Sequence, residues 1–66
     1  MLLWEPVDKK NAVGWLYAGE PCTILRLGRV SGVVRAVDVE ANGVKIIHIG
    51  DFKTAFESAG QGVEVA

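Results

Sequence analysis

The chain has 66 residues, of which 50% are hydrophobic, 8% aromatic and 23% charged, and its formal net charge is −1. This length allows one domain, and the apolar content excludes a disordered tail. Cys22 is the only cysteine and His48 the only histidine, which excludes an intrachain disulfide and a zinc site with four soft ligands. A core of this size supplies only about 3–5 kcal/mol, so we expect a second copy of the chain to complete the fold.

The charge balance and the short apolar runs also narrow the classes of partner. A net charge of −1 argues against capture of nucleic acid by bulk charge, although a local basic patch stays compatible with it. Charges or glycines interrupt every apolar run, so no membrane-spanning segment is expected. The lone thiol and the lack of an export signal favour a reducing, cytoplasmic location.

Apolar residues recur mostly with a period of two, in short runs that glycine-containing turns separate. This alternation is typical of closely spaced strands that bury one face. The sequence therefore predicts an all-β fold of five short antiparallel strands. Their predicted ranges are residues 1–5, 13–18, 22–29, 33–40 and 44–49, with connections at 6–12, 19–21, 30–32 and 41–43.

Asn42-Gly43 is the most definite turn, because both residues accept the positive φ angles of a type I′ hairpin turn. As a two-residue loop it determines three cross-strand pairs. These pairs are Glu40–Lys45, Val39–Ile46 and Val37–His48. We expect the first to be an ion pair, and the alternation places both valines and Ile46 on the buried face.

The connection at residues 30–32 is less constrained than Asn42-Gly43. A three-residue loop would keep two leucines on the buried face of the hairpin. Its pairs would be Leu25–Val37 and Leu27–Arg35. A two-residue loop would place Arg26 on that face instead, so the sequence favours the longer loop.

The period changes after residue 49, where a short helix is predicted over about residues 52–59. Asp51 is a good N-cap, and Gly60 is a natural residue to follow the helix. One apolar stripe consists of Phe52, Ala55, Phe56 and Ala59. A helix of about eight residues does not persist alone in water, so its phenylalanines must lie on the sheet or on a partner chain.

These elements form a single β domain over residues 1–60. Residues 61–66 are then either a tail or one more short strand over residues 63–65. No internal repeat or linker is visible.

No catalytic arrangement is recognisable in the sequence. The candidate nucleophiles are Cys22, Ser31 and Ser58, and no glycine-rich loop joins a strand to a helix as a phosphate site requires. A Cys22–His48 pair stays open, but a lone cysteine at the start of a strand is usually a small buried hydrophobe. We therefore expect no enzymatic activity, no cofactor and no metal.

Trp4, Trp15 and Tyr17 form an aromatic set on the first two predicted strands, and Phe52 and Phe56 belong to the predicted helix. Packing in the core and at an interface is the favoured interpretation of these residues. A platform for a peptide or an unstacked base is the alternative.

His48 and the basic residues each allow two interpretations. His48 is either a half-buried histidine bonded to the backbone or a functional residue. The cations alternate with apolar residues and with carboxylates, which is typical of the solvated face of a sheet. The alternative is an edge that contacts phosphates. The cations are Arg26, Arg29, Arg35, Lys45 and Lys53, with Lys9 and Lys10 in the first connection.

Scattered positions over residues 1–59 are similar to a known family. They are Met1-Leu2-Leu3, Val13-Gly14, Gly19-Glu20 before Thr23-Ile24, Leu27-Gly28, Gly32 and Val34-Arg35. The most specific stretch is Val44-Lys45-Ile46-Ile47-His48, followed by Asp51 and Phe52. On these positions the chain resembles the carbon storage regulator family of small RNA-binding translational repressors, with an insertion in the first connection.

The resemblance implies five strands and a C-terminal helix in an intertwined homodimer, in which strands of both chains complete each sheet. It also implies binding of single-stranded RNA loops that contain GGA. Two family arginines that contact RNA are replaced here by Pro6 and Ile49. Either nearby cations compensate, or the fold has been kept and the RNA function altered or lost. The residues expected to contact RNA are Ile47, His48, Lys45, Arg35, Lys9 and Lys10.

We therefore expect a non-enzymatic, homodimeric RNA-binding regulator of translation, or a divergent relative of one. The alternative is an SH3-like small barrel that binds protein, closed by residues 63–65, with Trp15 and Tyr17 lining a groove. A purely structural subunit is a third possibility. The expected partners are a second copy of the chain and single-stranded RNA loops, or another protein, and no membrane.

Overall fold

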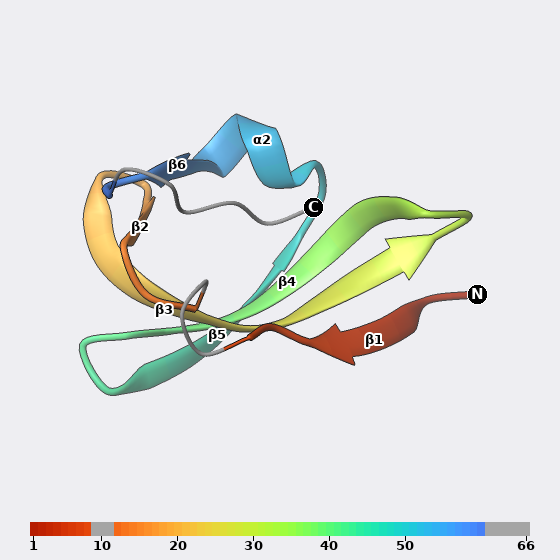
Figure 1. Cartoon of the computed structure of the whole chain (residues 1–66), viewed down its shortest axis with the longest axis horizontal. Helices are drawn as coiled ribbons and strands as arrows, with labels where there is room; N and C mark the ends of the chain where they lie inside the picture. The colour runs from red at the N-terminus through yellow and green to blue at the C-terminus, as the bar shows by residue number, and fades with distance from the viewer. Residues whose placement is uncertain (9–11, 61–66) are drawn as a thin grey trace.

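The computed structural model describes residues 1–8 and 12–60. Within these residues it is mostly antiparallel β-sheet with the short helix α2 near the C-terminal end, as the sequence predicts (Figure 1). The elements in chain order are β1 (Leu3–Pro6), β2 (Trp15–Tyr17), β3 (Glu20–Val30), β4 (Val33–Ala41), β5 (Val44–Ile49), α2 (Phe52–Ala55) and β6 (Phe56–Ser58).

The strands form one curved sheet in the order β5-β4-β3-β2-β6, and β1 also pairs with β3. Strand β3 is long enough to serve both halves of the sheet: its first residues pair with β2 and its last with β1. In Figure 1, β3 bends so that β2 and β6 curl over the side of the sheet on which α2 lies. Every described strand pairs within one chain, and the intertwined homodimer stays a prediction.

Three tight turns have the same backbone conformation, with two consecutive residues at positive φ. The turns are Ala18-Gly19 (52° and 84°), Ser31-Gly32 (51° and 80°) and Asn42-Gly43 (53° and 78°). These are the angles of type I′ turns, whose twist matches that of the flanking strands. The first turn was predicted at residues 19–21; the structure places it one residue earlier, and Glu20 and Pro21 begin β3.

The β4–β5 hairpin has the register predicted from Asn42-Gly43. The observed pairs include Glu40–Lys45, Val39–Ile46 and Val37–His48. Glu40 and Lys45 are opposite one another, but they form no ion pair among the contacts of the described chain. The local turn chemistry therefore determined the strand pairing without the expected charge contact.

The three-residue loop predicted at residues 30–32 is wrong, because Ser31-Gly32 is a two-residue turn that pairs Val30 with Val33. Two register shifts follow along the hairpin, where Arg35 on β4 and Leu25 on β3 are left as extra, bulged residues. Leu27 consequently faces Val37 and not Arg35, and it is buried. The bulges return the apolar residues to the core face after the shorter turn.

The helix predicted over residues 52–59 is also wrong in its length. Asp51 does cap the helix, since its side chain accepts a hydrogen bond from the backbone N–H of Lys53, but α2 ends at Ala55. The next residues form β6, which pairs with β2 and so satisfies backbone groups on the facing edges of both strands. A helix of so few turns gains little by extending, so strand pairing prevails.

Strand β6 extends the curved sheet beyond β2, and the sheet stays open because β5 and β6 are the two ends of the strand order. Strands β2 to β5, the helical turn and β6 follow one another as the SH3-like alternative requires, with Phe56–Ser58 in the place of its last strand. Residues 63–65, which were expected to have that role, lie outside the described residues.

The core lies between the curved sheet and α2. Its buried members are Trp15, Cys22, Ile24, Leu27, Val37, Val39, Phe52 and Phe56. The rings of Phe52 and Phe56 stack with centroids 4.9 Å apart, and Trp15 meets Phe52 edge to face at 5.1 Å. The phenylalanines thus pack within one chain, where aromatic pairs add to simple burial.

Candidate functional site

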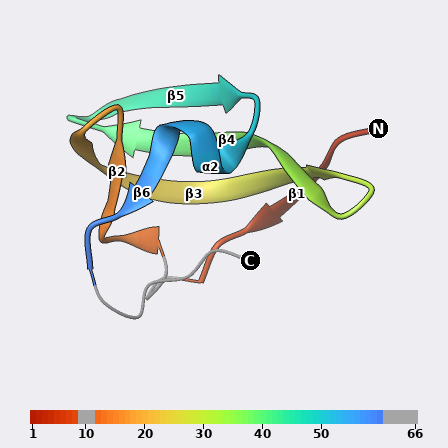
Figure 2. The ribbon, with the colours of Figure 1, turned by 90° about the horizontal axis from the view of Figure 1, so that it is seen from above.

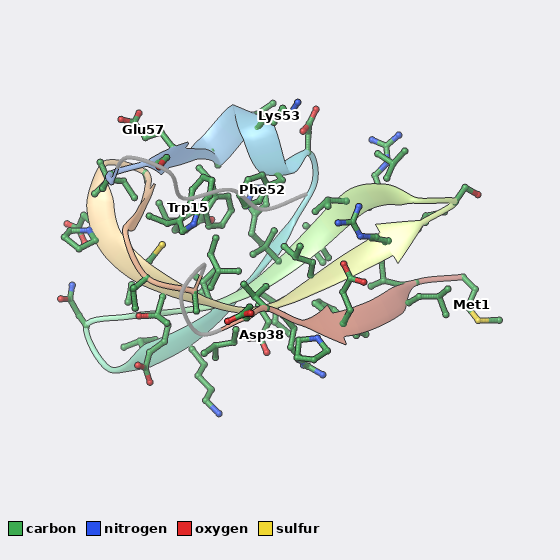
Figure 3. All side chains as sticks on the ribbon, viewed as in Figure 1. Met1, Trp15, Asp38, Phe52, Lys53 and Glu57 are labelled. Carbon is green, nitrogen blue, oxygen red and sulfur yellow. The ribbon has the colours of Figure 1, made fainter. Side chains whose placement is uncertain are left out.

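The sheet has a second face, opposite the core, which we call the open face. It is defined by Trp4, Arg26, Asp38, Ile47 and Ile49, which belong to the four strands β1, β3, β4 and β5. Figure 3 shows Asp38 projecting from the side of the sheet opposite to Trp15 and Phe52. Cross-strand partners share a face, so the partners of Asp38 also lie on this side.

The open face is organised in cross-strand rows. One row is apolar throughout and consists of Trp4, Gly28, Ala36 and Ile49. The next row consists of Pro6, Arg26, Asp38 and Ile47. Leu2 lies over the first row, since a Cβ at Gly28 would meet its side chain at 3.0 Å.

A charged pair lies in the middle of the open face. Arg26 donates to Oδ2 of Asp38 through Nε and approaches it through Nη2, both at 3.0 Å. The guanidinium carbon of Arg26 also lies 4.7 Å from the ring centroid of Trp4, a cation–π distance. Both contacts are made within the chain. The guanidinium of Arg26 is therefore already paired with Asp38 and is not a free cation on the open face.

Strand β5 supplies the exposed apolar part of the open face. Ile47 is 56% exposed and Ile49 is 74% exposed. Isoleucines on both faces of β5 are typical of strands that are buried on both sides. Apolar residues at both alternating positions are already visible in the sequence of residues 44–49. From the sequence, however, Ile46 was predicted to be buried and Ile47 to contact RNA, and a second apolar face was not predicted.

The structure does not bring together the residues predicted to contact RNA. Lys45 and Ile47 lie on the open face, but His48 points to the opposite side, because successive strand residues alternate. Arg35 is exposed at the β4 bulge, beside the residue that pairs with Ile49. Ile49 is four positions along β5 from Lys45, a distance of about 13 Å. Arg35, near Ile49, is therefore not close to Lys45. Lys9 and Lys10 lie outside the described residues.

His48 is half-buried and contacts the backbone, which is the first of the two environments predicted for it. Its Nε2 lies 3.4 Å from the carbonyl oxygen of Asp51, and its Nδ1 lies 3.2 Å from the hydroxyl of Tyr17. A carbonyl can only accept, so Nε2 is the donor in the contact with Asp51, and in the neutral ring Nδ1 then accepts from the Tyr17 hydroxyl. The ring also meets Phe56 edge to face. His48 therefore connects β5 to β2, to the start of α2 and to β6.

The aromatic residues divide between the two sides of the sheet. Trp15, with 7% exposure, and both phenylalanines are in the core, while Trp4 is half-buried on the open face. The groove expected between Trp15 and Tyr17 is therefore not formed, because the indole is covered. Tyr17 is half-buried and packs on Phe56 with ring centroids 4.7 Å apart.

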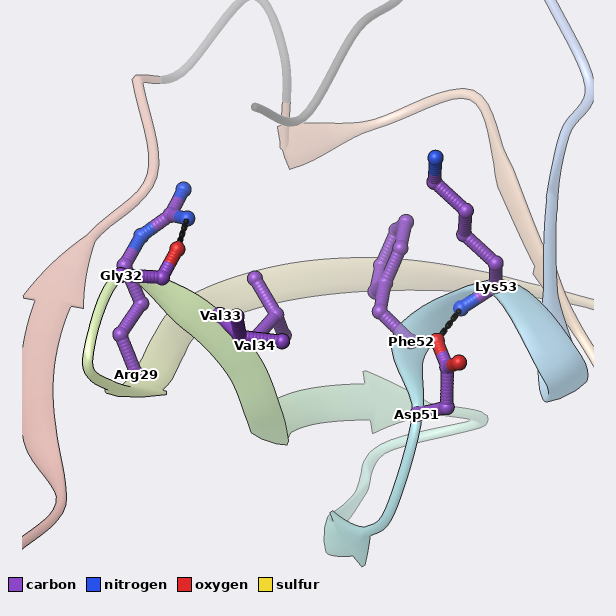
Figure 4. Close-up of a pocket in the computed structure, with 7 residues that line it drawn as sticks. All are labelled: Arg29, Gly32, Val33, Val34, Asp51, Phe52 and Lys53. Carbon is purple, nitrogen blue, oxygen red and sulfur yellow. Dashed lines mark hydrogen bonds between the residues drawn. The ribbon is translucent and has the colours of Figure 1, made fainter.

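A small cleft lies between the β3–β4 turn and the start of α2 (Figure 4). Its volume is about 280 Å³, and its lining is Arg29, Gly32, Val33, Val34, Asp51, Phe52 and Lys53. Arg29 donates to the Gly32 carbonyl at 3.0 Å and to Glu5 at 2.7 Å, and Asp51 caps α2. The polar groups of the cleft are thus largely occupied within the chain, apart from the amine of Lys53.

The candidate nucleophiles and His48 do not lie together in the described chain. Burial raises the pKa of the Cys22 thiol above its ordinary value, which lowers its reactivity. His48 bonds to Tyr17 and Asp51, and not to Cys22, Ser31 or Ser58. No group of three metal-ligating side chains is found in residues 1–8 and 12–60.

No helix of the described chain is long and apolar enough to span a membrane. Comparison of the sequence and the structure with protein-family models, curated proteins and solved structures gives no match. The open face, with its exposed isoleucines beside the Trp4–Arg26–Asp38 group, is the candidate functional surface of this sheet.

Proposed function

We propose that this protein is a non-enzymatic, self-associating interaction module, a small β domain that serves as a structural subunit of a protein assembly. The observation that supports this proposal is the open face, on which Ile49 of the apolar row and Ile47 of the next row are 74% and 56% exposed. Large exposed apolar side chains that gather on one face are typical of protein interaction sites.

Burial of these side chains would provide the driving force for assembly. Full burial of an isoleucine side chain contributes about 1.5–3 kcal/mol, and both isoleucines are still more than half exposed. Trp4 extends the apolar surface, and its contact with Arg26 shields it only in part. A domain of 66 residues has a small core, so covering this face would also stabilise the fold.

The charges of the open face favour protein over nucleic acid as the partner. On the open face Arg26 is paired with Asp38, and on the opposite side of the sheet Arg29 is paired with Glu5, so an RNA phosphate would have to compete with a carboxylate at each site. Arg35, Lys45 and Lys53 make no ion pair within the described ranges, but they are not clustered. Affinity for RNA depends mainly on phosphate neutralisation, and the open face offers little of it.

The RNA-binding regulator that the family resemblance implies stays a prediction, and the same experiment tests it. Ile47 and Lys45 are both exposed on β5, so a GGA-containing RNA loop is the appropriate probe. Salt-dependent binding that Lys45→Ala with His48→Ala abolishes would support the regulator and contradict our proposal.

The test of self-association is the molar mass in solution, measured by light scattering and sedimentation over a range of concentrations. We expect a mass above the 7.1 kDa of one chain. The variant with Ile47→Ser and Ile49→Ser should dissociate. A matched control with Leu3→Ser and Val33→Ser, also exposed apolar residues, should not. A wild-type protein of 7.1 kDa at every concentration would overturn the proposal.

A further inference from the structure

Strand β5 has an unpaired outer edge. It is the last strand in the order β5-β4-β3-β2-β6 and pairs only with β4. Figure 2 shows β5 at the rim of the molecule, with β4 on one side and no described element beyond it. Of the three edge strands, β1 has four residues and ends in Pro6, and β6 has three residues. Strand β5 has six residues without proline, glycine or bulge, and such an edge readily pairs with another strand.

The hairpin geometry determines which backbone groups of β5 face this edge. In a hairpin with a two-residue loop, the residues next to the loop exchange hydrogen bonds, and this alternates along the strands. Val44, Ile46 and His48 therefore bond to β4. Lys45, Ile47 and Ile49 direct their N–H and C=O groups outward. The residues with free backbone groups are thus also the residues whose side chains lie on the open face.

We infer that β5 pairs antiparallel with β5 of a second copy of the chain, with Ile47 opposite Ile47 at a twofold axis. This inference rests on the proposed self-association and specifies its geometry. In this register Lys45 of each copy lies opposite Ile49 of the other. All three outward-facing residues of each strand then find partners, and no donor or acceptor of the edge is left over.

The side chains select the same register. The twofold axis is perpendicular to the sheet, so the open faces of both copies lie on one side and the four exposed isoleucines of that side meet. The two Lys45 residues are separated by about 13 Å, and their aliphatic stems lie along Ile49 of the partner. A register with Lys45 opposite Lys45 would bring like charges together and leave both isoleucines outside the pairing.

The isologous arrangement favours a second copy over an unrelated peptide. Two antiparallel strands can be related by a twofold axis, so the six-residue strand of one copy is a complete pairing partner for the same strand of another copy. Addition of a strand from another protein would use the same backbone groups, and it is one of the outcomes below.

A proline substitution isolates the backbone contribution. Lys45→Pro removes an outward N–H without removing a hydrogen bond to β4, and edge strands accept proline at such positions. Lys45→Ala removes the same charge and keeps the N–H. We expect Lys45→Pro to weaken self-association at least tenfold and Lys45→Ala to change it less than threefold. Unchanged circular dichroism of the monomer shows that the fold is intact.

Disulfide trapping tests the proposed register of the two β5 strands. It does not depend on the Lys45→Pro variant and can be carried out even if that variant fails to fold. Hydrogen-bonded antiparallel partners have Cα atoms about 5.5 Å apart, within the range of a disulfide. Under mild oxidation, Ile47→Cys should form a covalent dimer by itself. Lys45→Cys and Ile49→Cys should each stay monomeric alone and cross-link when mixed. Lys53→Cys, on α2, is the control for random collision. Cys22 is buried and should stay reduced in all of them.

The outcomes separate this inference from the proposed function. Self-association that Lys45→Pro leaves unchanged, without cross-linking through residue 47, would overturn the β5 pairing and leave the interaction module intact. A protein that is monomeric at every concentration would overturn both. A monomer whose β5 amides become protected from hydrogen exchange only on addition of another protein would assign the edge to a different partner and contradict the inference.

Discussion

The hydroxyl of Tyr17 lies 3.2 Å from Nδ1 of His48, and this contact joins two strands that are not neighbours in the sheet. Tyr17 is on β2 and His48 on β5, at opposite ends of the path through β3 and β4. The two rings also meet edge to face, with centroids 5.5 Å apart. The pair therefore connects β2 and β5 on the side of the curved sheet where α2 and β6 pack.

Removal of this hydroxyl should destabilise the fold without disturbing the ring contacts. We expect Tyr17→Phe to lower the free energy of unfolding by about 0.5–1.5 kcal/mol, the typical contribution of one hydrogen bond. Urea denaturation followed by fluorescence measures the change. A double-mutant cycle with His48→Leu should show a coupling of similar size, and a coupling near zero would contradict the assigned bond.

The turn at Ala18-Gly19 offers a stabilising substitution. Ala18 has a φ of 52°, although left-handed backbone costs an L-residue about 1–2 kcal/mol and asparagine less. Ala18→Asn makes this turn resemble Asn42-Gly43. We expect the free energy of unfolding to rise by about 0.5–1 kcal/mol and the melting temperature with it. The reciprocal change, Asn42→Ala, should have the opposite sign. A decrease in stability with Ala18→Asn would show that another contact determines the turn.

Gly28 and Leu2 should be energetically coupled. A Cβ at Gly28 would lie 3.0 Å from both Cγ and Cδ1 of Leu2, so Leu2 must move if the glycine is replaced. We expect Gly28→Ala to destabilise the protein by about 1 kcal/mol, in the range for overpacking of a well-packed contact. In the Leu2→Ala background, Gly28→Ala should cost nearly nothing. Equal costs in both backgrounds, measured by thermal unfolding, would place the strain elsewhere.

The Cys22 thiol should give the protein a weak dependence on alkaline pH. Burial raises the pKa of Cys22 in the folded protein above its ordinary value of 9.0, because the thiolate is poorly solvated there. Above pH 9.0 the unfolded chain therefore loses this proton before the folded chain does, and stability falls as the pH rises through this window. Below pH 9.0 the contribution is complete and constant.

A denaturation series from pH 7 to pH 10.5 measures this effect. Cys22→Ala, which has no ionisable group, should reduce the alkaline decline while lowering stability at neutral pH through lost packing. Parallel pH profiles for both proteins would contradict the assignment. The native thiol should also react slowly with iodoacetamide until the protein unfolds.

Local chemistry accounts for the parts of the fold that the sequence determined by itself. The Asn42-Gly43 turn and the register of β4 with β5 depend on the φ preferences of two residues and on the alternation of adjacent ones. These effects act within about ten residues, so the all-β class and this hairpin were both predictable. The N-cap at Asp51 is another feature of this kind.

Only the tertiary structure decided how far α2 extends and which residues form the last strand of the sheet. Phe56 suits a helical stripe, but β2 offers an unpaired edge some forty residues away in sequence, and pairing with it satisfies more backbone groups. The bulge at Arg35 likewise results from the pairing of β4 with β3 and not from a local preference of the chain. His48 and Ile47 are adjacent in sequence and lie on opposite faces of the sheet. Which face is covered depends on where α2 and β6 pack, because burial is a property of the assembled chain.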